Sequence, residues 1–313
     1  MFERWSLLED EPSELDVEYL RSKKIDPFDE SQLLEIVRSK PMSLKGNSAF
    51  RMLRTRGVAT ARSIPVCKEL CLDRHSDIQS EALVVLDGIA GASEIAFYRR
   101  LARTKQQCKH FLFDQSWAIG RWGDASDVPA AAKILRRRYS RRVKSDWMGT
   151  STPLSCLLRF LVEFAEDPVA RQATSWIRER WQTLPKGERH AAELTLPEFS
   201  EIGEARWVAV VGTPNPWANG MVSHDPEIYM SIPVDVTHPR FVRHAVRAAR
   251  YASLIVVVEP GVEAFDEIRS AFPRNVKTVL ACNPGIQWSP RAGGPWRAAV
   301  EAARQKVCAA LSG

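Results

Sequence analysis

Several features that would assign a protein to a class are absent from this 313-residue sequence. No run approaches the roughly 18–20 consecutive apolar residues that a membrane-spanning helix needs, so we expect no transmembrane segment and no membrane partner. The first residues are acidic and lack the basic and apolar regions of a secretory signal peptide, which favours a cytoplasmic location. The six cysteines have no paired spacing, as expected of reduced thiols rather than a disulfide framework.

The sequence also lacks the short motifs that identify common catalytic and nucleotide-binding sites. It has no G-x-G-x-x-G after the first apolar strand candidate, no G-x-x-x-x-G-K-[ST] and no G-x-S-x-G. These absences exclude the standard dinucleotide fingerprint, the P-loop NTPases and the nucleophile elbow of the α/β-hydrolases. No cofactor is established by a motif, and a nucleotide or NAD as ligand is a hypothesis that must rest on other features.

One group of residues has a spacing that could suit a metal. Cys67, Cys71 and His75 recur every four residues, which would place them on one face of a helix, as zinc ligands can be. A fourth ligand has no evident source. Two small core cysteines and a histidine near a helix end explain the pattern better, and we predict no metal site.

From about residue 30 to 198 the sequence has helical patterning throughout, after an acidic segment at 1–29. Apolar residues recur three and four positions apart, strand-like alternation is absent, and the breaks are short and contain Asp, Gly or Pro. The predicted helices span residues 31–40, 78–91, 94–103, 128–139, 153–166 and 170–184.

Parts of this helical region repeat one plan, as in residues 73–101 and 114–137: an acidic start, a helix, a small-residue turn and a second helix. These units resemble HEAT-like repeats. The likeness is greatest in AIGRWGDASDVPAAAKIL, where Gly123 stands at the turn and Pro129 opens the next helix. The resemblance implies an α-solenoid of stacked helix pairs whose curved surface binds a macromolecular partner.

Near residue 200 the helical pattern gives way to short apolar runs that alternate with amphipathic helices. Such alternation indicates βα units and a mainly parallel sheet. The expected strands are 207–212, 228–236, 253–259 and 276–282, and the expected helices are 239–252, 262–272 and 294–311. We therefore predict an α plus α/β protein: an α-solenoid of HEAT-like helix pairs over 30–198, then a small Rossmann-type sandwich with a four-stranded sheet over 201–313.

Three of the expected strands end in the same way, in VVGTPNP, VVVEPG and LACNPG, at a polar side chain with proline next to it or close behind. In an open parallel sheet such ends lie along one edge, where ligands bind. Ordinary turn chemistry would explain the same residues. A ligand site at this edge would be formed by Thr213, Asn215, His224, Asp235, His238 and Asn283.

Residues 243–272, RHAVRAARYASLIVVVEPGVEAFDEIRSAF, resemble a stretch of Toll/interleukin-receptor-like and nucleoside deoxyribosyltransferase-like domains. In both families a helix leads into an apolar strand and the next helix carries a glutamate. The resemblance implies a carboxylate that acts at a ribosyl bond, where it stabilises positive charge on the sugar. The matching residues are Glu263 and Glu267, with Glu259 as a third candidate. An enzyme that cleaves N-glycosidic bonds of nucleotides or nucleosides is therefore an alternative function.

Basic residues are concentrated between 90 and 150, where thirteen Lys and Arg stand against five Asp and Glu. Such a cluster can neutralise phosphates, although it can equally be the solvated end of a helix. Nucleic-acid binding is thus a second alternative. Its contacts would come from the densest stretch, with Arg136, Arg137, Arg138, Arg141, Arg142 and Lys144.

The preferred interpretation is an interaction protein, a sensor or adaptor. Its helical repeats would bind a protein partner, and its C-terminal α/β domain would bind a small ligand or a second partner. The sequence does not decide whether the protein is an enzyme.

Overall fold

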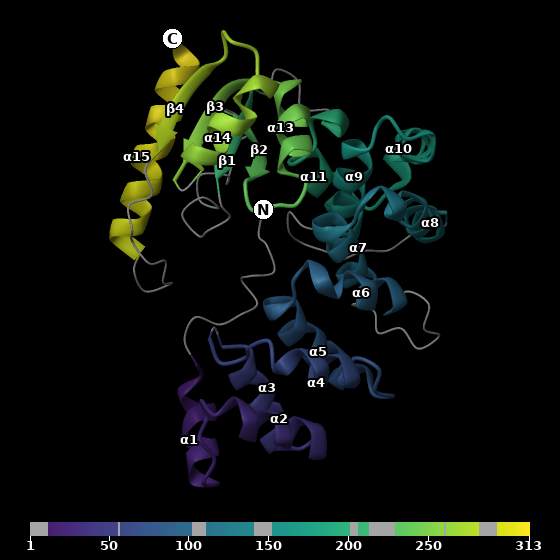
Figure 1. Ribbon diagram of the computed structural model, residues 1–313, viewed down its shortest axis with the longest axis vertical. Helices are drawn as coiled ribbons and strands as arrows, with labels where there is room; N and C mark the ends of the chain where they lie inside the picture. The colour runs from purple at the N-terminus through teal and green to yellow at the C-terminus, as the bar shows by residue number, and fades with distance from the viewer. Residues whose placement is uncertain are drawn as a thin grey trace. The chain divides into compact units, whose positions relative to one another are not determined.

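The computed structural model describes residues 12–55, 57–101, 111–140, 152–200, 206–212, 229–259, 261–281 and 293–313, without the side chains of 111–114 and 293–297 (Figure 1). Contacts between residues divide the chain into two compact units. The N-terminal unit ends at Trp122 and the second unit begins at Gly123. None of the helices in the described ranges is long and apolar enough to cross a membrane.

The described part of the N-terminal unit is helical. Its elements are α1 (Glu14–Ser22), α2 (Glu30–Ser39), α3 (Leu44–Leu53), α4 (Ser63–Leu70), α5 (Ser76–Ile89), η2 (Ala92–Glu94), α6 (Ile95–Leu101) and α7 (Phe111–Trp122). Helix α2 packs against α3, α4 against α5, and α6 against α7. The first two pairs are joined by contacts of α2 with α4 and of α3 with α5.

Helix α1 lies in the acidic segment at 1–29, where the apolar pattern did not predict a helix. The reason is that one of its two buried positions is a carboxylate, Asp16, and the other is Leu20. Asp16 accepts hydrogen bonds from Ser48 Oγ at 2.7 Å and Arg51 Nη1 at 3.1 Å, both on α3. A buried polar contact therefore takes the place of the apolar stripe on which sequence patterns depend.

The second unit begins with helices and continues with alternating strands and helices. Its elements are η3 (Ala125–Asp127), α8 (Val128–Tyr139), α9 (Pro153–Glu163), α10 (Pro168–Glu179), η4 (Trp181–Thr183), α11 (Lys186–Glu193), η5 (Pro197–Phe199), β1 (Trp207–Gly212), β2 (Met230–Asp235), α13 (Phe241–Ala249), β3 (Ala252–Val258), α14 (Val262–Ile268), η6 (Arg269–Ala271), β4 (Lys277–Ala281) and α15 (Gly293–Ser312).

Capping residues set several helix starts where the sequence placed them. Asp124 and Asp127 form a reciprocal capping box, and α8 begins directly after it with Pro129 in its first turn. Thr152 and Ser155 form a second reciprocal capping box, at the start of α9. The orphan N–H groups of these first turns are thereby satisfied, which fixes the boundaries locally.

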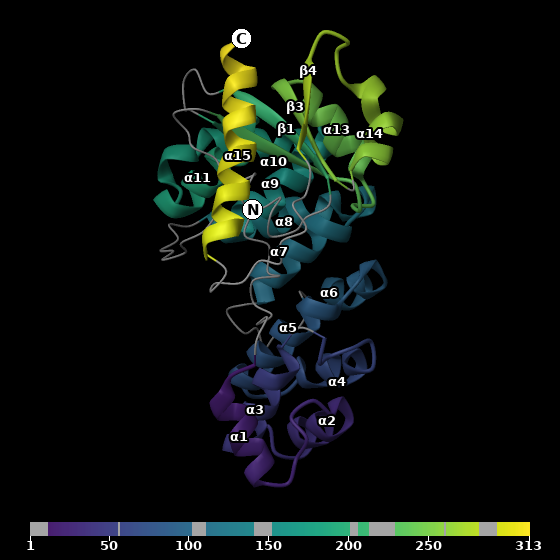
Figure 2. The same ribbon diagram turned by 90° about the vertical axis from the view of Figure 1, so that its left-hand side faces the viewer.

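The four strands form one parallel sheet in the order β2-β1-β3-β4, as the alternation of elements predicted. All six residues of β1 are buried. Ala209 and Val211 pack in the core with α13 and α14, whereas Val208 and Val210 pack with α15 on the other face. Figure 2 shows the sheet between these two helical layers. Coverage on both faces explains why β1 and residues 254–258 of β3 are continuously apolar.

The change from helices to α/β structure lies between Phe199 and Trp207, close to the predicted position. The division into compact units, however, falls at Trp122 and Gly123, so α8 to α11 group with the sheet. Helix α13 makes direct contacts with α9, which explains this grouping. That residues 30–198 and 201–313 are separate domains stays a prediction.

Candidate functional site

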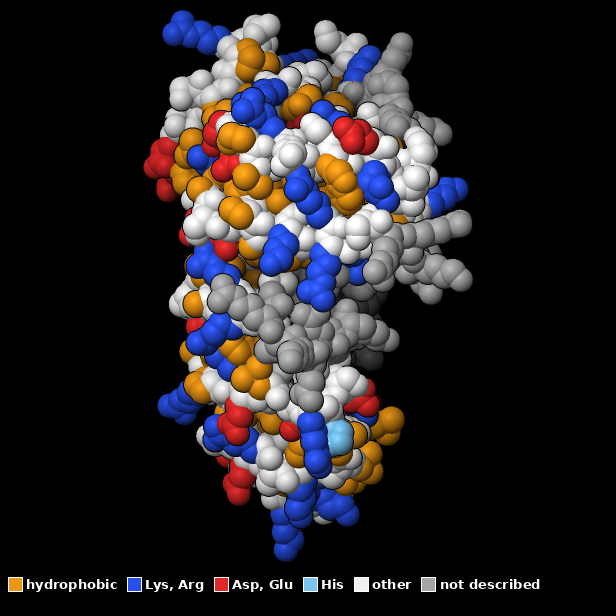
Figure 3. Space-filling view, turned by 90° about the vertical axis from the view of Figure 1, so that its right-hand side faces the viewer, with side chains coloured by type: hydrophobic (Ala, Val, Ile, Leu, Met, Phe, Trp, Pro, Cys, Tyr) orange, Lys and Arg blue, Asp and Glu red, His pale blue; other side chains and the backbone are white. Residues whose placement is uncertain are grey.

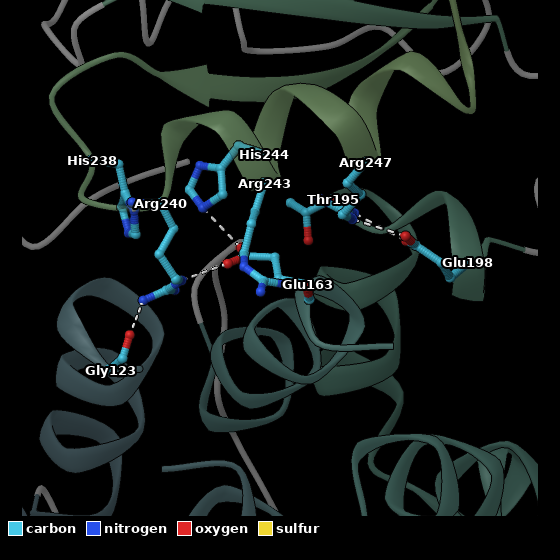
Figure 4. A network of polar contacts seen from close by, with 9 residues as sticks. All are labelled: Gly123, Glu163, Thr195, Glu198, His238, Arg240, Arg243, His244 and Arg247. Atoms are coloured by element: carbon cyan, nitrogen blue, oxygen red, sulfur yellow. Dashed lines mark hydrogen bonds and ion pairs between the residues drawn. The ribbon is translucent and has the colours of Figure 1, made fainter. Parts of the chain in front are cut away.

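Helix α13 turns a row of basic side chains toward α9 and η5 (Figure 4), and all of them except Arg243 are at most 10 % exposed. The row recurs every three or four residues, which places it along one side of the helix. On another side Ala245 and Ala248 are fully buried in the core of the sheet. Their small side chains let α13 lie close to the strands. The row consists of Arg240, Arg243, His244 and Arg247.

Glu163 of α9 is the centre of this network, and its side chain is fully buried. Its Oε2 accepts a hydrogen bond from Arg240 Nε at 2.8 Å, and its Oε1 lies 2.9 Å from His244 Nε2. Arg240 also donates to the carbonyl of Gly123, and its guanidinium lies 5.1 Å from the centre of the Phe160 ring. Burial alone would raise the pKa of the Glu163 carboxyl, but the His244 and Arg240 side chains lower it to about 2.

A second buried pair lies one turn further along α13. Arg247 donates from Nε to Glu198 Oε1 at 2.8 Å and from Nη2 to Glu198 Oε2 at 3.0 Å, a bidentate arrangement. Burial alone would lower the pKa of the Arg247 guanidinium, and the Glu198 carboxylate raises it above its usual range. Arg243 is more exposed and donates to Glu166 Oε1 at 2.5 Å. Three carboxylates of the helical layer therefore hold α13.

Two residues that the sequence predicted for a ligand site, Asp235 and His238, are buried beside this network. Asp235 ends β2, and its Oδ1 accepts from Thr237 N at 2.9 Å and Thr237 Oγ1 at 2.6 Å. His238 Nδ1 accepts from Arg240 N at 3.1 Å, which leaves the proton of a neutral ring on Nε2. The His238 and His244 ring centres are 4.2 Å apart. The end of β2 is thus connected through side chains to α9.

The ends of β1 and β3 approach each other closely through two glycines. A Cβ atom on Gly261 would lie 2.6 Å from the Val258 carbonyl oxygen and 2.8 Å from Gly212 Cα. In the sheet, β2 lies on one side of β1, and β3 and then β4 lie on the other side, so the strand order reverses between β1 and β3. In open parallel sheets, the gap between strands at such a reversal of order is the usual ligand position. The sequence showed both glycines but not that they meet.

The three candidate catalytic glutamates, Glu259, Glu263 and Glu267, are exposed. Glu259 follows β3, and the other two lie on α14. Water surrounds an exposed carboxylate and weakens its interaction with a developing positive charge. Thr213, Asn215, His224 and Asn283 lie outside the described residues, so their gathering at the sheet edge stays a prediction.

The predicted nucleic-acid contacts have different environments. Arg137 is exposed, but Arg138 donates from Nη2 to Glu188 Oε1 at 3.0 Å, and the Glu188 side chain is fully buried. Arg138 therefore ties α8 to α11. Figure 3, which views the side of the molecule where α8 and α10 lie, shows Lys and Arg interspersed with apolar and acidic side chains. Arg136 is partly exposed, and the rest of the basic stretch, Arg141, Arg142 and Lys144, lies outside the described residues.

Cys67 and Cys71 are buried in the N-terminal unit, whereas His75 is exposed. Burial, with the nearby charge of Glu30 as a smaller cause, raises the pKa of the Cys67 thiol to about 12. A thiol held protonated in this way is a poor metal ligand. Within the part of the chain that the structure describes, no three His, Cys, Asp or Glu side chains group to hold a metal ion.

The low pKa of Glu163 predicts a specific dependence of stability on pH. Its folded-state pKa of about 2 lies below the ordinary value of 4.5. The stabilisation is therefore fully present above the unfolded-state pKa and is lost as pH falls through about 2. It amounts to about 3 kcal/mol. We expect the free energies of unfolding of the wild type and of Glu163→Gln, measured in urea, to differ most above about pH 5 and to converge toward pH 2. Parallel curves would contradict this assignment.

Comparison with known proteins found no matching family model, no matching curated protein sequence and no matching solved structure. The HEAT-like and Toll-like or deoxyribosyltransferase-like resemblances therefore stay predictions.

Proposed function

We propose that this protein is a binding protein, a sensor or adaptor, which joins a ligand site at the sheet edge to a partner-binding helical surface. The observation that supports this most directly is the buried network between β2, α13 and α9. Asp235 and His238 at the end of β2 lead into α13, and α13 is held to α9 by Glu163. A ligand at this edge would therefore act next to the attachment of the helices.

Buried ion pairs favour such coupling because they cannot be deformed gradually. A buried charge that loses its partner pays the full cost of desolvation, so the network is either complete or disrupted. Packed elements that have only discrete arrangements can convert a small displacement at one site into a shift of a whole helix. The contact between α13 and α9 has this character, since the side chains of Glu163 and Arg240 are each at most 8 % exposed.

The proposal includes an α-solenoid of helix pairs and a Rossmann-type domain. The packing of α2 on α3 and of α4 on α5, with contacts between the two pairs, supports a solenoid of stacked helix pairs. The strand order and the close approach of Gly212 and Gly261 support a Rossmann-type domain with its ligand between β1 and β3. For the ligand we propose a nucleotide, a nucleoside or NAD.

A thermal-shift series on the full chain tests the ligand site. The full chain is needed because residues 201–313 alone would lack Glu163, the buried partner of Arg240. We expect at least one of these ligands at millimolar concentration to raise Tm, since a ligand at 100 times its Kd stabilises by about 2.7 kcal/mol.

Two exposed carboxylates give a matched pair of variants for this test. Glu259→Gln, at the end of β3, should reduce the ligand-induced shift. Glu267→Gln, further along α14, should leave it unchanged. Unaltered melting with every nucleotide, nucleoside and NAD would overturn the ligand site. Loss of the shift in Glu267→Gln instead of Glu259→Gln would move the site toward the predicted glycosidic carboxylate.

A further inference from the structure

A pocket of about 310 Å³ opens on the N-terminal unit between α3, α5 and the turn that precedes α3. Phe50 of α3 and Ile78 of α5 line it, and both are almost fully buried. Met42 of the turn also lines it, but 56 % of this side chain is exposed. An exposed methionine is a flexible apolar contact that adapts to different ligand shapes. The pocket has room for one aliphatic side chain, whose main apolar contact is Met42, because only 1 % of Phe50 and 3 % of Ile78 is exposed.

The two helical walls of the pocket carry opposite charges. Arg51 and Arg54 stand on the α3 wall, and Asp77 and Glu81 stand on the α5 wall. Arg54 Nη1 lies 3.5 Å from Glu81 Oε2, a long ion pair. Arg51 pairs with Asp16 from α1, yet its side chain is still 47 % exposed. A ligand with a negative group over α3 and a positive group over α5 would match both walls.

An extended peptide has the right geometry for such a site. Alternate side chains of an extended chain point to the same side, so residues i−2, i and i+2 can all face the pocket. Residues i−2 and i+2 are about 13 Å apart at 3.3 Å per residue. This distance suits groups that flank two packed helices, whose axes lie about 8–10 Å apart.

We propose that this pocket docks an extended segment of a protein partner with the pattern acidic-x-aliphatic-x-basic. The aliphatic side chain contacts Met42, Phe50 and Ile78, the acidic residue lies beside Arg51, and the basic residue lies beside Asp77. Nucleic acid suits the site less well, because its phosphates would also lie beside Asp77 and Glu81. The inference rests on the proposed function, in that the helices bind a protein partner, and adds the chemistry of that partner.

Methyl NMR on the full-length protein with ¹³C-methyl methionine tests this inference. The sequence has six methionines, and Met42→Leu identifies the Met42 signal. Met230, fully buried in the sheet, is the internal reference. The probes are the synthetic peptides GESLSKG, its charge-swapped form GKSLSEG, and GESASKG without the aliphatic side chain. We expect GESLSKG to shift the Met42 signal saturably at millimolar concentration while Met230 stays unchanged.

The comparison peptides and variants separate the contributions of shape and charge. We expect GESASKG to bind at least about tenfold more weakly, since burial of the leucine side chain is lost. The charge-swapped peptide should bind about three- to tenfold more weakly. Met42→Glu removes the reporter signal, so its affinity is measured by fluorescence anisotropy of a dye-labelled GESLSKG. The affinity should fall about tenfold, whereas that of Leu72→Glu, measured in the same way, should not. Leu72 is a matched control because it is similarly exposed and does not line the pocket.

A double variant tests the charged walls without removing their ion pair. Arg54→Glu with Glu81→Arg exchanges the two charges and should remove the preference for GESLSKG over GKSLSEG. No movement of the Met42 signal with any peptide would overturn the inference, and equal binding of the charge-swapped peptides would overturn its charge pattern. Either failure is distinguishable from failure of the ligand site, which is tested by nucleotide-dependent melting in the second unit.

Discussion

Replacing Glu163 by alanine is expected to lower the free energy of unfolding by about 3–5 kcal/mol. The cost arises because Arg240 and His244 would stay buried without their carboxylate, with 8 % and 10 % of their side chains exposed. Urea denaturation monitored by tryptophan fluorescence and by circular dichroism measures the change. Agreement between the two probes would show that unfolding is a single transition.

Glu166 provides the matched control for this substitution. It lies three residues later and pairs with Arg243 of the same helix, but its side chain is 63 % exposed. Glu166→Ala should therefore cost less than about 1 kcal/mol. Substituting Met for both Glu163 and Arg240 should recover part of the lost free energy of unfolding, because it removes the Arg240 charge that would otherwise stay buried without its carboxylate. Equal effects of Glu163→Ala and Glu166→Ala would contradict a buried role for Glu163.

Replacing Gly261 by alanine is expected to destabilise the protein by about 1–3 kcal/mol through overpacking. The added Cβ would lie 2.6 Å from the Val258 carbonyl oxygen and 2.9 Å from the Val211 carbonyl oxygen. Both are backbone atoms of central strands and cannot rotate away as a side chain could. The free energy of unfolding in urea measures the loss.

Gly91→Ala is the control for this second prediction. A Cβ on Gly91 would have no atom within 4 Å, and the residue has φ of −122°, which alanine adopts readily. We expect a change within about 0.5 kcal/mol. If Gly261→Ala were as mild as Gly91→Ala, the close approach of β1 and β3 would be wrong. The ligand position proposed between these strands would then lose its structural basis.

The strands and most helices could be predicted because their signals are local. The run WVAVVG forms β1 with the predicted bounds. A strand covered on both faces is apolar at every position, so its first and last residues can be recognised in the sequence. Helix α8 occupies 128–139 as predicted, because the capping box and Pro129 lie next to it in sequence. The parallel arrangement followed from the alternation of strands and helices, which requires crossover connections.

The candidate site could be predicted only in part. The pattern placed Asp235 and His238 near a strand end, but it gave no sign that both would be buried beside a charged network. Arg138 was assigned to a basic cluster, whereas its partner Glu188 lies fifty positions away. Charge density along a sequence does not show which basic side chains are already paired in the fold.

The sequence by itself determined the strands, most of the helices and which of their faces are apolar. Periodicity and capping depend on residues within a few positions, so they can be recognised in one chain without its fold. Only the tertiary structure decided what covers those faces. Glu163 and Arg240 are 77 positions apart, and Glu198 and Arg247 are 49 apart. A buried charge is tolerated only where the fold places an oppositely charged side chain beside it. Here the packing of α13 on α9 and η5 brings these partners together.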